Sequence, residues 1–133
     1  MAMIGFPAHA GSCRVQISSN EEHSAIAQNV MMGVERAIRA SPQLSAATLK
    51  DGHDVEFRLI SAPPEGRSEV TAATPFRLFF VLTDRHGKLL SADTLRCPHG
   101  AGACIAPVMR YVEDHCSRRP GGAPTPKPRR SAT

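Results

Sequence analysis

The sequence predicts one small α+β domain, a two-layer sandwich in which two helices cover a mostly antiparallel sheet of four or five strands. Two segments carry apolar residues at helical spacing, and the segments around them alternate apolar and polar residues as strands do. The length of 133 residues is that of a single domain. The expected order is β-α-(β)-β-β-β-α, with the bracketed strand over residues 43–50.

The first strand is predicted over Cys13–Ser18, and a long helix follows it directly. Ser19 and Glu22 have the spacing of a capping box, which predicts that the helix begins there, with acidic residues in its first turn. Ser41 ends it, because a residue that precedes proline avoids the α region. Its apolar stripe consists of Ile26, Val30, Val34, Ala37 and Ile38.

Three more strands are predicted over Asp54–Ile60, Phe76–Thr83 and Lys88–Cys97, with a loop over Pro63–Thr74. Phe76–Thr83 is apolar on both faces, which favours a central strand covered on at least part of each side. Asp84-Arg-His-Gly87 predicts a hairpin turn.

The second helix is predicted over Ala103–Cys116, with Pro107 in its first turn, where proline is tolerated. Its apolar stripe consists of Ile105, Val108, Met109, Val112 and Cys116.

The chain divides into three parts, residues 1–10, 11–116 and 117–133. The last part holds four prolines, five Lys or Arg and no Asp or Glu, which predicts a disordered basic tail. Residues 1–116 are nearly neutral, although the whole chain has a formal charge of +4. A near-neutral body argues against a nucleic-acid-binding domain, which has a basic face. The longest apolar run, Leu78–Leu82, is far too short for a membrane helix.

Residues 1–10 resemble the end of a secretory signal, and Ala8-His9-Ala10 fits the small-x-small rule for cleavage. The positive n-region and most of the apolar segment are missing, so an ordinary disordered N-terminus is the alternative. A start codon further upstream would explain a partial signal, and the mature chain would then begin at Gly11. This interpretation predicts a periplasmic or secreted protein.

The four cysteines predict a disulfide framework, because an exported chain with an even number of cysteines usually pairs them. Cys104 and Cys116 would lie about 18 Å apart along one helix, too far for a bond. Two connectivities remain. We favour Cys97–Cys104 with Cys13–Cys116, because the first bond closes a short Gly/Pro loop, and the alternative is Cys13–Cys104 with Cys97–Cys116.

A zinc site and a cysteine nucleophile are the competing interpretations of this region. Cys97, His99, Cys104, His115 and Cys116 cluster within twenty residues, but their spacing is not that of a known zinc site. His115 and Cys116 point about 100° apart on a helix, which prevents a shared metal ion or a catalytic dyad. We therefore predict no metal, no cofactor and no catalytic residues, and the sequence contains no nucleotide-binding or hydrolase motif.

Arg36-Ala-Ile-Arg-Ala-Ser-Pro-Gln-Leu44 and Phe76-Arg-Leu-Phe-Phe-Val-Leu-Thr-Asp-Arg-His-Gly-Lys-Leu-Leu90 resemble a bacterial envelope pattern. It is that of the small α/β domains of the TolB amino-terminal and CsgG/LpoB type, in which a long helix breaks at Ser-Pro and a Gly-Lys hairpin follows. The resemblance covers residues 13–95. Departures are the absence of a lipid-attachment context before Cys13, the Cys97–Cys104 loop and the basic tail.

The resemblance implies a non-enzymatic module that binds an envelope protein. We expect its surface to be the solvent face of the sheet or the Pro63–Thr74 loop. The alternatives are a cytoplasmic regulator or nucleic-acid accessory protein that uses the basic tail, with reduced cysteines, and an enzyme or inhibitor whose site forms only in three dimensions.

Overall fold

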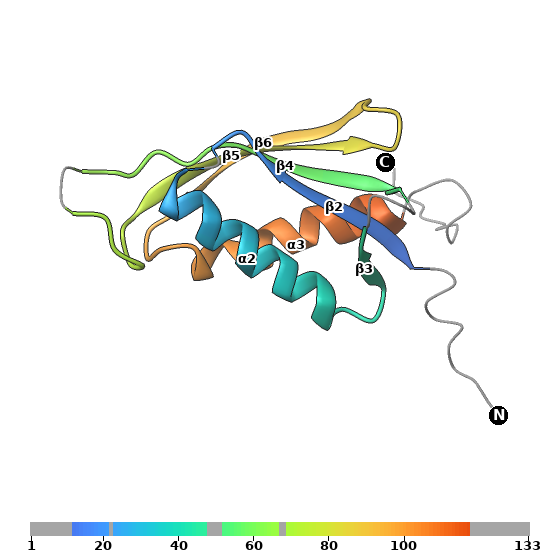
Figure 1. Ribbon diagram of the computed structural model, residues 1–133, viewed down its shortest axis with the longest axis horizontal. Coiled ribbons are helices and arrows are strands. Elements are labelled where there is room, and N and C mark those ends of the chain that lie inside the picture. The colour runs from blue at the N-terminus through green and yellow to red at the C-terminus, as the bar shows by residue number, and fades with distance from the viewer. Residues whose placement is uncertain (1–11, 22, 48–51, 67–68, 118–133) are drawn as a thin grey trace, which may run out of the picture.

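The computed structural model describes residues 12–21, 23–47, 52–66 and 69–117, and it confirms the α+β class and the element order. Within these residues both helices lie on one face of a five-stranded sheet, as Figure 1 shows. The elements are β2 (Cys13–Ser19), α2 (Ala25–Ala40), β3 (Leu44–Ala46), β4 (Val55–Ser61), β5 (Phe76–Asp84), β6 (Leu89–Cys97) and α3 (Gly102–Ser117).

Two predicted segments lie largely outside the described residues. They are the possible signal remnant at residues 1–10 and the tail that follows Ser117. The same holds for residues 48–50 of the bracketed strand, of which the structure describes β3 alone.

The sheet is mixed, with strand order β3-β2-β4-β5-β6. β2 pairs in parallel with both β3 and β4, whereas β4–β5 and β5–β6 are antiparallel. The parallel pairing of β2 with β3 follows from α2, because a helix that crosses over returns the chain to the end of the sheet from which it left. The antiparallel pairing that the sequence predicts for most of the sheet is found only from β4 to β6.

Helix α2 begins later than the capping-box pattern predicts. Its N-cap is Ser24, whose Oγ accepts a hydrogen bond from the backbone N–H of Ala27 at 3.1 Å. Ser19 is instead the last residue of β2, and its Oγ accepts the N–H of Glu21 at 2.9 Å. The predicted acidic first turn is thus wrong, since α2 has no acidic residue there. The end of α2 at Ser41 is as predicted.

Helix α3 extends one residue beyond the predicted bounds at each end. Pro107 lies inside it and past the first turn, so that part of the prediction is wrong. Ser117, expected to open the tail, is the last helical residue, and its Oγ donates to the carbonyl of Glu113 at 2.9 Å.

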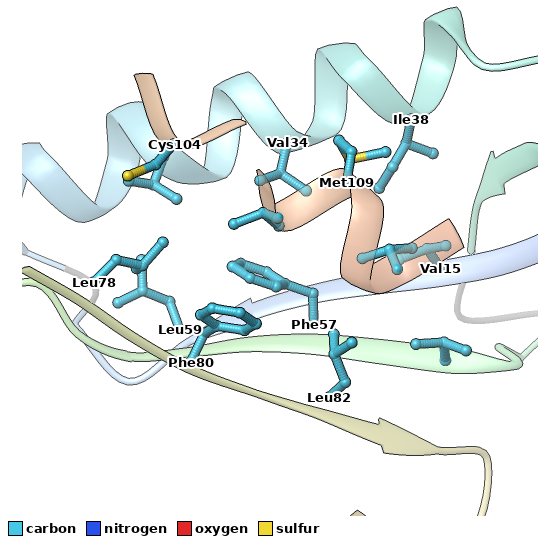
Figure 2. Packing of buried hydrophobic residues seen from close by; sticks show 14 of the residues in the cluster. Val15, Val34, Ile38, Phe57, Leu59, Leu78, Phe80, Leu82, Cys104 and Met109 are labelled. Carbon is cyan, nitrogen blue, oxygen red and sulfur yellow. The ribbon is translucent and has the colours of Figure 1, made fainter. Parts of the chain in front are cut away.

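The core lies between the helices and the inner face of the sheet (Figure 2). Alternation along β4 and β5 directs every second side chain inward. The rings of Phe57 and Phe80 meet there with centroids 5.4 Å apart. Fully buried members of this cluster include Val15, Val30, Val34, Ile38, Val55, Phe57, Leu59, Phe76, Leu78, Phe80, Leu82, Val108 and Val112.

The loop before α3 packs on the long loop between β4 and β5 at Gly100. Gly100 has a φ of +98°, and a Cβ placed there would lie 2.1 Å from the carbonyl oxygen of Ala72. Gly87, in the β5–β6 turn, also has a positive φ of +82°, but no atom lies within 4 Å of its Cβ position. A side chain at either position would strain the backbone, but only a side chain at Gly100 would also clash with a neighbouring atom.

We predict that Gly100→Ala lowers the free energy of unfolding by more than about 2 kcal/mol, because the clash adds to the conformational strain. Gly87→Ala should cost about 1–2 kcal/mol, since it introduces strain alone. Urea denaturation of both variants tests this. Equal losses at the two sites would contradict the close packing at Gly100.

Candidate functional site

The structure joins the four cysteines into two bonds, Cys13–Cys116 and Cys97–Cys104. The S–S distances are 2.02 and 1.99 Å, and the described residues include no free cysteine. This is the connectivity favoured from the sequence. Thiolates for the zinc and nucleophile interpretations are therefore lacking, and no three His, Cys, Asp or Glu of the described residues are grouped to hold a metal ion.

Both bonds hold α3. Cys104 lies in its first turn and is linked to the end of β6, whereas Cys116 lies in its last turn and is linked to the start of β2. Helix α3 thus crosses the inner face from β6 to β2 (Figure 1). All four cysteines belong to the buried core, which is the setting of structural rather than reactive cysteines.

The opposite, outer face of the sheet carries an apolar patch. Alternation in β5 places Phe79 and Val81 on this face, where both are half-buried. Together with Ile60 of β4 and Ala92 of β6 they line a shallow hollow of about 380 Å³. We call Ile60, Phe79, Val81 and Ala92 the outer-face patch. No helix of the described residues lies over it, since both helices are on the other face (Figure 1).

A cluster of arginines borders the patch at one end. Arg77 and Arg96 are cross-strand neighbours on β5 and β6. They share one carboxylate, that of Glu65, with N···O distances of 3.6 and 3.0 Å. The hydrogen bond and charge of Arg96, and then the charge of Arg77, lower the pKa of Glu65 below its usual value. Two guanidinium groups against one carboxylate leave a net positive charge here.

The side of the outer face toward β2 is polar. Glu56 of β4 accepts hydrogen bonds from Ser18 at 2.5 Å and from Arg58 at 3.0 Å. These side chains thus meet one another's hydrogen-bonding needs, as buried and half-buried polar groups usually do. The apolar part of the outer face is therefore confined to β5, β6 and the end of β4.

The predicted hairpin turn is structural. Asp84 Oδ1 accepts the backbone N–H groups of Lys88 and His86, at 2.9 and 2.8 Å, and these bonds lower the pKa of Asp84. Gly87 takes the left-handed conformation that such a turn requires. The Asp-Arg-His-Gly segment thus fixes the hairpin.

A second hollow lies on the inner side of the sheet, beside α3. It has a volume of about 730 Å³ and is lined in part by Leu95, Pro107, Arg110 and Tyr111. The hydroxyl of Tyr111 donates to the carboxylate of Asp93 on β6. Both hollows therefore border β6, one on each side.

Sequence reasoning found part of this site. Phe79 and Val81 were visible as the second apolar face of their strand, which we predicted to be at least partly covered. Both are half-buried, although no helix of the described residues lies on that face. The Glu65–Arg77–Arg96 cluster was missed. No local signal could have found it, because Glu65 and Arg96 are 31 positions apart.

Comparison with known proteins gives similarities of fold only. No protein-family model matches the chain, and no curated protein matches its sequence. A PelC dodecamer from Paraburkholderia phytofirmans is 14% identical, with coverage of 86% of this chain and 94% of that chain and a TM-score of 0.47.

An uncharacterized lipoprotein B from Nitrosomonas europaea is 16% identical, with 79% and 75% coverage and a TM-score of 0.43. A minor lipoprotein from Acinetobacter baumannii is 12% identical, with 79% and 78% coverage and a TM-score of 0.45. The TolB and CsgG/LpoB resemblance stays a prediction, and the function is inferred from the chain's own residues.

We predict that the two disulfides stabilise the fold unequally. In the chain-entropy account, the bond across a separation of 103 residues stabilises by about 4–5 kcal/mol and the bond across seven by about 2–3 kcal/mol. Cys13→Ala/Cys116→Ala should therefore lower the free energy of unfolding more than Cys97→Ala/Cys104→Ala does. Urea denaturation of the two double variants compares them. A larger loss for the short loop would contradict the account.

Proposed function

We propose that this protein is a non-enzymatic, exported protein-binding module of the bacterial envelope, located in the periplasm or secreted. The observation that carries the proposal is the outer-face patch. It is an apolar area on an open sheet face, bordered by paired arginines. Protein interfaces have this composition, with apolar and aromatic side chains at the centre and arginine enriched over lysine.

Export is supported by the cysteines. All four are paired and buried, and stable structural disulfides form in oxidising compartments. No helix of the described residues is long and apolar enough to cross a membrane.

A protein partner fits the outer face better than a small molecule does. Small-molecule sites are concave and enclose most of the ligand, whereas this hollow is shallow and lies on a sheet surface. Phe79 and Val81 offer surface that only a partner of matching shape would remove from water. Fully burying an exposed Phe or Val side chain contributes about 1.5–3 kcal/mol, and these half-buried side chains leave part of that gain to a partner.

Site-specific photocross-linking in the native host tests this proposal. A photoreactive side chain at Thr94, which is exposed and opposite Phe79, should give a discrete protein adduct. Adding Phe79→Thr and Val81→Thr should abolish it, because losing both contacts weakens binding by more than about tenfold. Threonine keeps the β-propensity of the strand.

Met32 provides the matched control, since it is an exposed apolar residue of α2, 52% accessible and on the helical side. A photoreactive group at this position should give no discrete adduct, and Met32→Gln should leave the Thr94 adduct unchanged. If no adduct forms at Thr94, or equal adducts form at both positions, partner binding through the outer face is wrong.

A further inference from the structure

Strand β6 forms one edge of the sheet along its whole length of nine residues. The other edge strand, β3, has only three. Within the described ranges, no strand pairs with the outer side of β6. Its outward N–H and C=O groups therefore face no strand, although the N–H of Thr94 donates locally to Asp93 Oδ1 at 2.7 Å.

Edge strands are usually protected by lysine, proline, bulges or inward-pointing charges. Residues 90–95 of β6 contain no Lys, Arg or Pro. The one charged residue among them, Asp93, faces the inner side, where its carboxylate accepts the hydroxyl of Tyr111 and the N–H of Thr94. The pairing irregularity lies at the hairpin end, between Leu82 and Thr83 of β5. The middle of the edge thus carries one inward-pointing charge but no Lys, Arg or Pro, which is only partial protection.

Both sides of this edge offer apolar surface. On the outer side, Ala92 and Phe79 line the first hollow. On the inner side, Leu95, Pro107 and Tyr111 line the second, beside the charged residues Arg110, Glu113 and Asp114 of α3. A strand added to β6 would direct alternate side chains to the two sides of the sheet. Strand addition takes its affinity from backbone hydrogen bonds and its specificity from such pockets.

Charge disfavours a second copy of this chain in two registers and favours an acidic segment of another protein. The edge is basic at both ends, with Arg96 at one and Lys88 at the other. Antiparallel pairing with a second copy centred on Ala92 would place Arg96 opposite Lys88 of that copy, and centring on Asp93 would oppose two aspartates. Like charges directly opposite destabilise strand pairs. The chain's own residues 117–133 are also basic.

We infer that β6 accepts an extended segment of another protein, with apolar side chains at alternate positions and acidic residues at both ends. This inference rests on the proposed function, because it names the manner in which the envelope partner would bind. The acidic ends would meet Arg96 and Lys88, and the apolar side chains would enter the two hollows.

The test uses the full oxidised chain and an array of synthetic peptides of nine residues, the length of β6. In each peptide, Thr alternates with Val, Ile, Leu or Phe. One set of peptides has Glu at both ends, and a second set has Lys at both ends. Glu-ended peptides should bind about tenfold more tightly than Lys-ended peptides in low salt, because the end charges attract or repel. Hydrogen exchange at residues 90–95 should slow when the best peptide binds.

Proline substitution separates strand pairing from docking on the face. Successive strand residues direct their N–H groups to opposite sides, so one of Ser91→Pro and Ala92→Pro removes an edge-facing donor while the other breaks a bond to β5. The variant with the higher melting temperature identifies the edge-facing position. That variant should lose peptide binding and, in cells, the Thr94 adduct.

Absence of peptide binding, equal binding of the two sets, or unchanged exchange at β6 would overturn the inference. A dimer whose β6 amides are already slow to exchange would also overturn it, in favour of a second copy. If the Thr94 adduct survives the edge proline but not Phe79→Thr/Val81→Thr, docking on the face stands without strand pairing. If no Thr94 adduct forms at all, the proposed function itself fails.

Discussion

Helix α3 is covalently tied at both ends, and the rest of the structure depends on this constraint. Its first turn is bonded to the end of β6 and its last turn to the start of β2. The buried stripe of Val108, Met109 and Val112 is thereby held in the core that α2, α3 and the inner face of the sheet form. A chain with few aromatic residues makes a modest core, and in such domains disulfides supply stability that burial alone does not.

The same constraint makes the sheet one-sided. Because α2 and α3 share the inner face (Figure 1), no helix of the described residues covers Phe79 and Val81 on the other, and both are only half-buried. Sheets with one face on the core are usually polar on the solvent side. The side toward β2 follows that rule through Glu56 and Arg58, whereas the side toward β6 departs from it. The departure coincides with the arginine cluster and the unpaired edge of β6, so all three features fall on one half of the domain.

Patterns within a single element were predictable, and relations between elements were not. Helical and strand periodicity gave the element order, and the Gly/Pro loop favoured the Cys97–Cys104 bond. The start of α2 was misplaced because Ser19 and Ser24 are both capping residues, and only the length of β2 decides between them. The parallel pairing of β2 with β4 and the sharing of Glu65 by two arginines depend on the path of the chain in space, for which neighbouring residues carry no signal.

The thiol state of the protein in its native host tests the central claim, that oxidation fixes α3 across the sheet of an exported protein. Protein is isolated in the presence of an alkylating agent and weighed intact, without reductant. We expect no alkylation and a mass lower by four hydrogens than that of the reduced chain, with peptide mapping that links Cys13 to Cys116 and Cys97 to Cys104. Four alkylated cysteines would contradict the account and would favour a cytoplasmic protein.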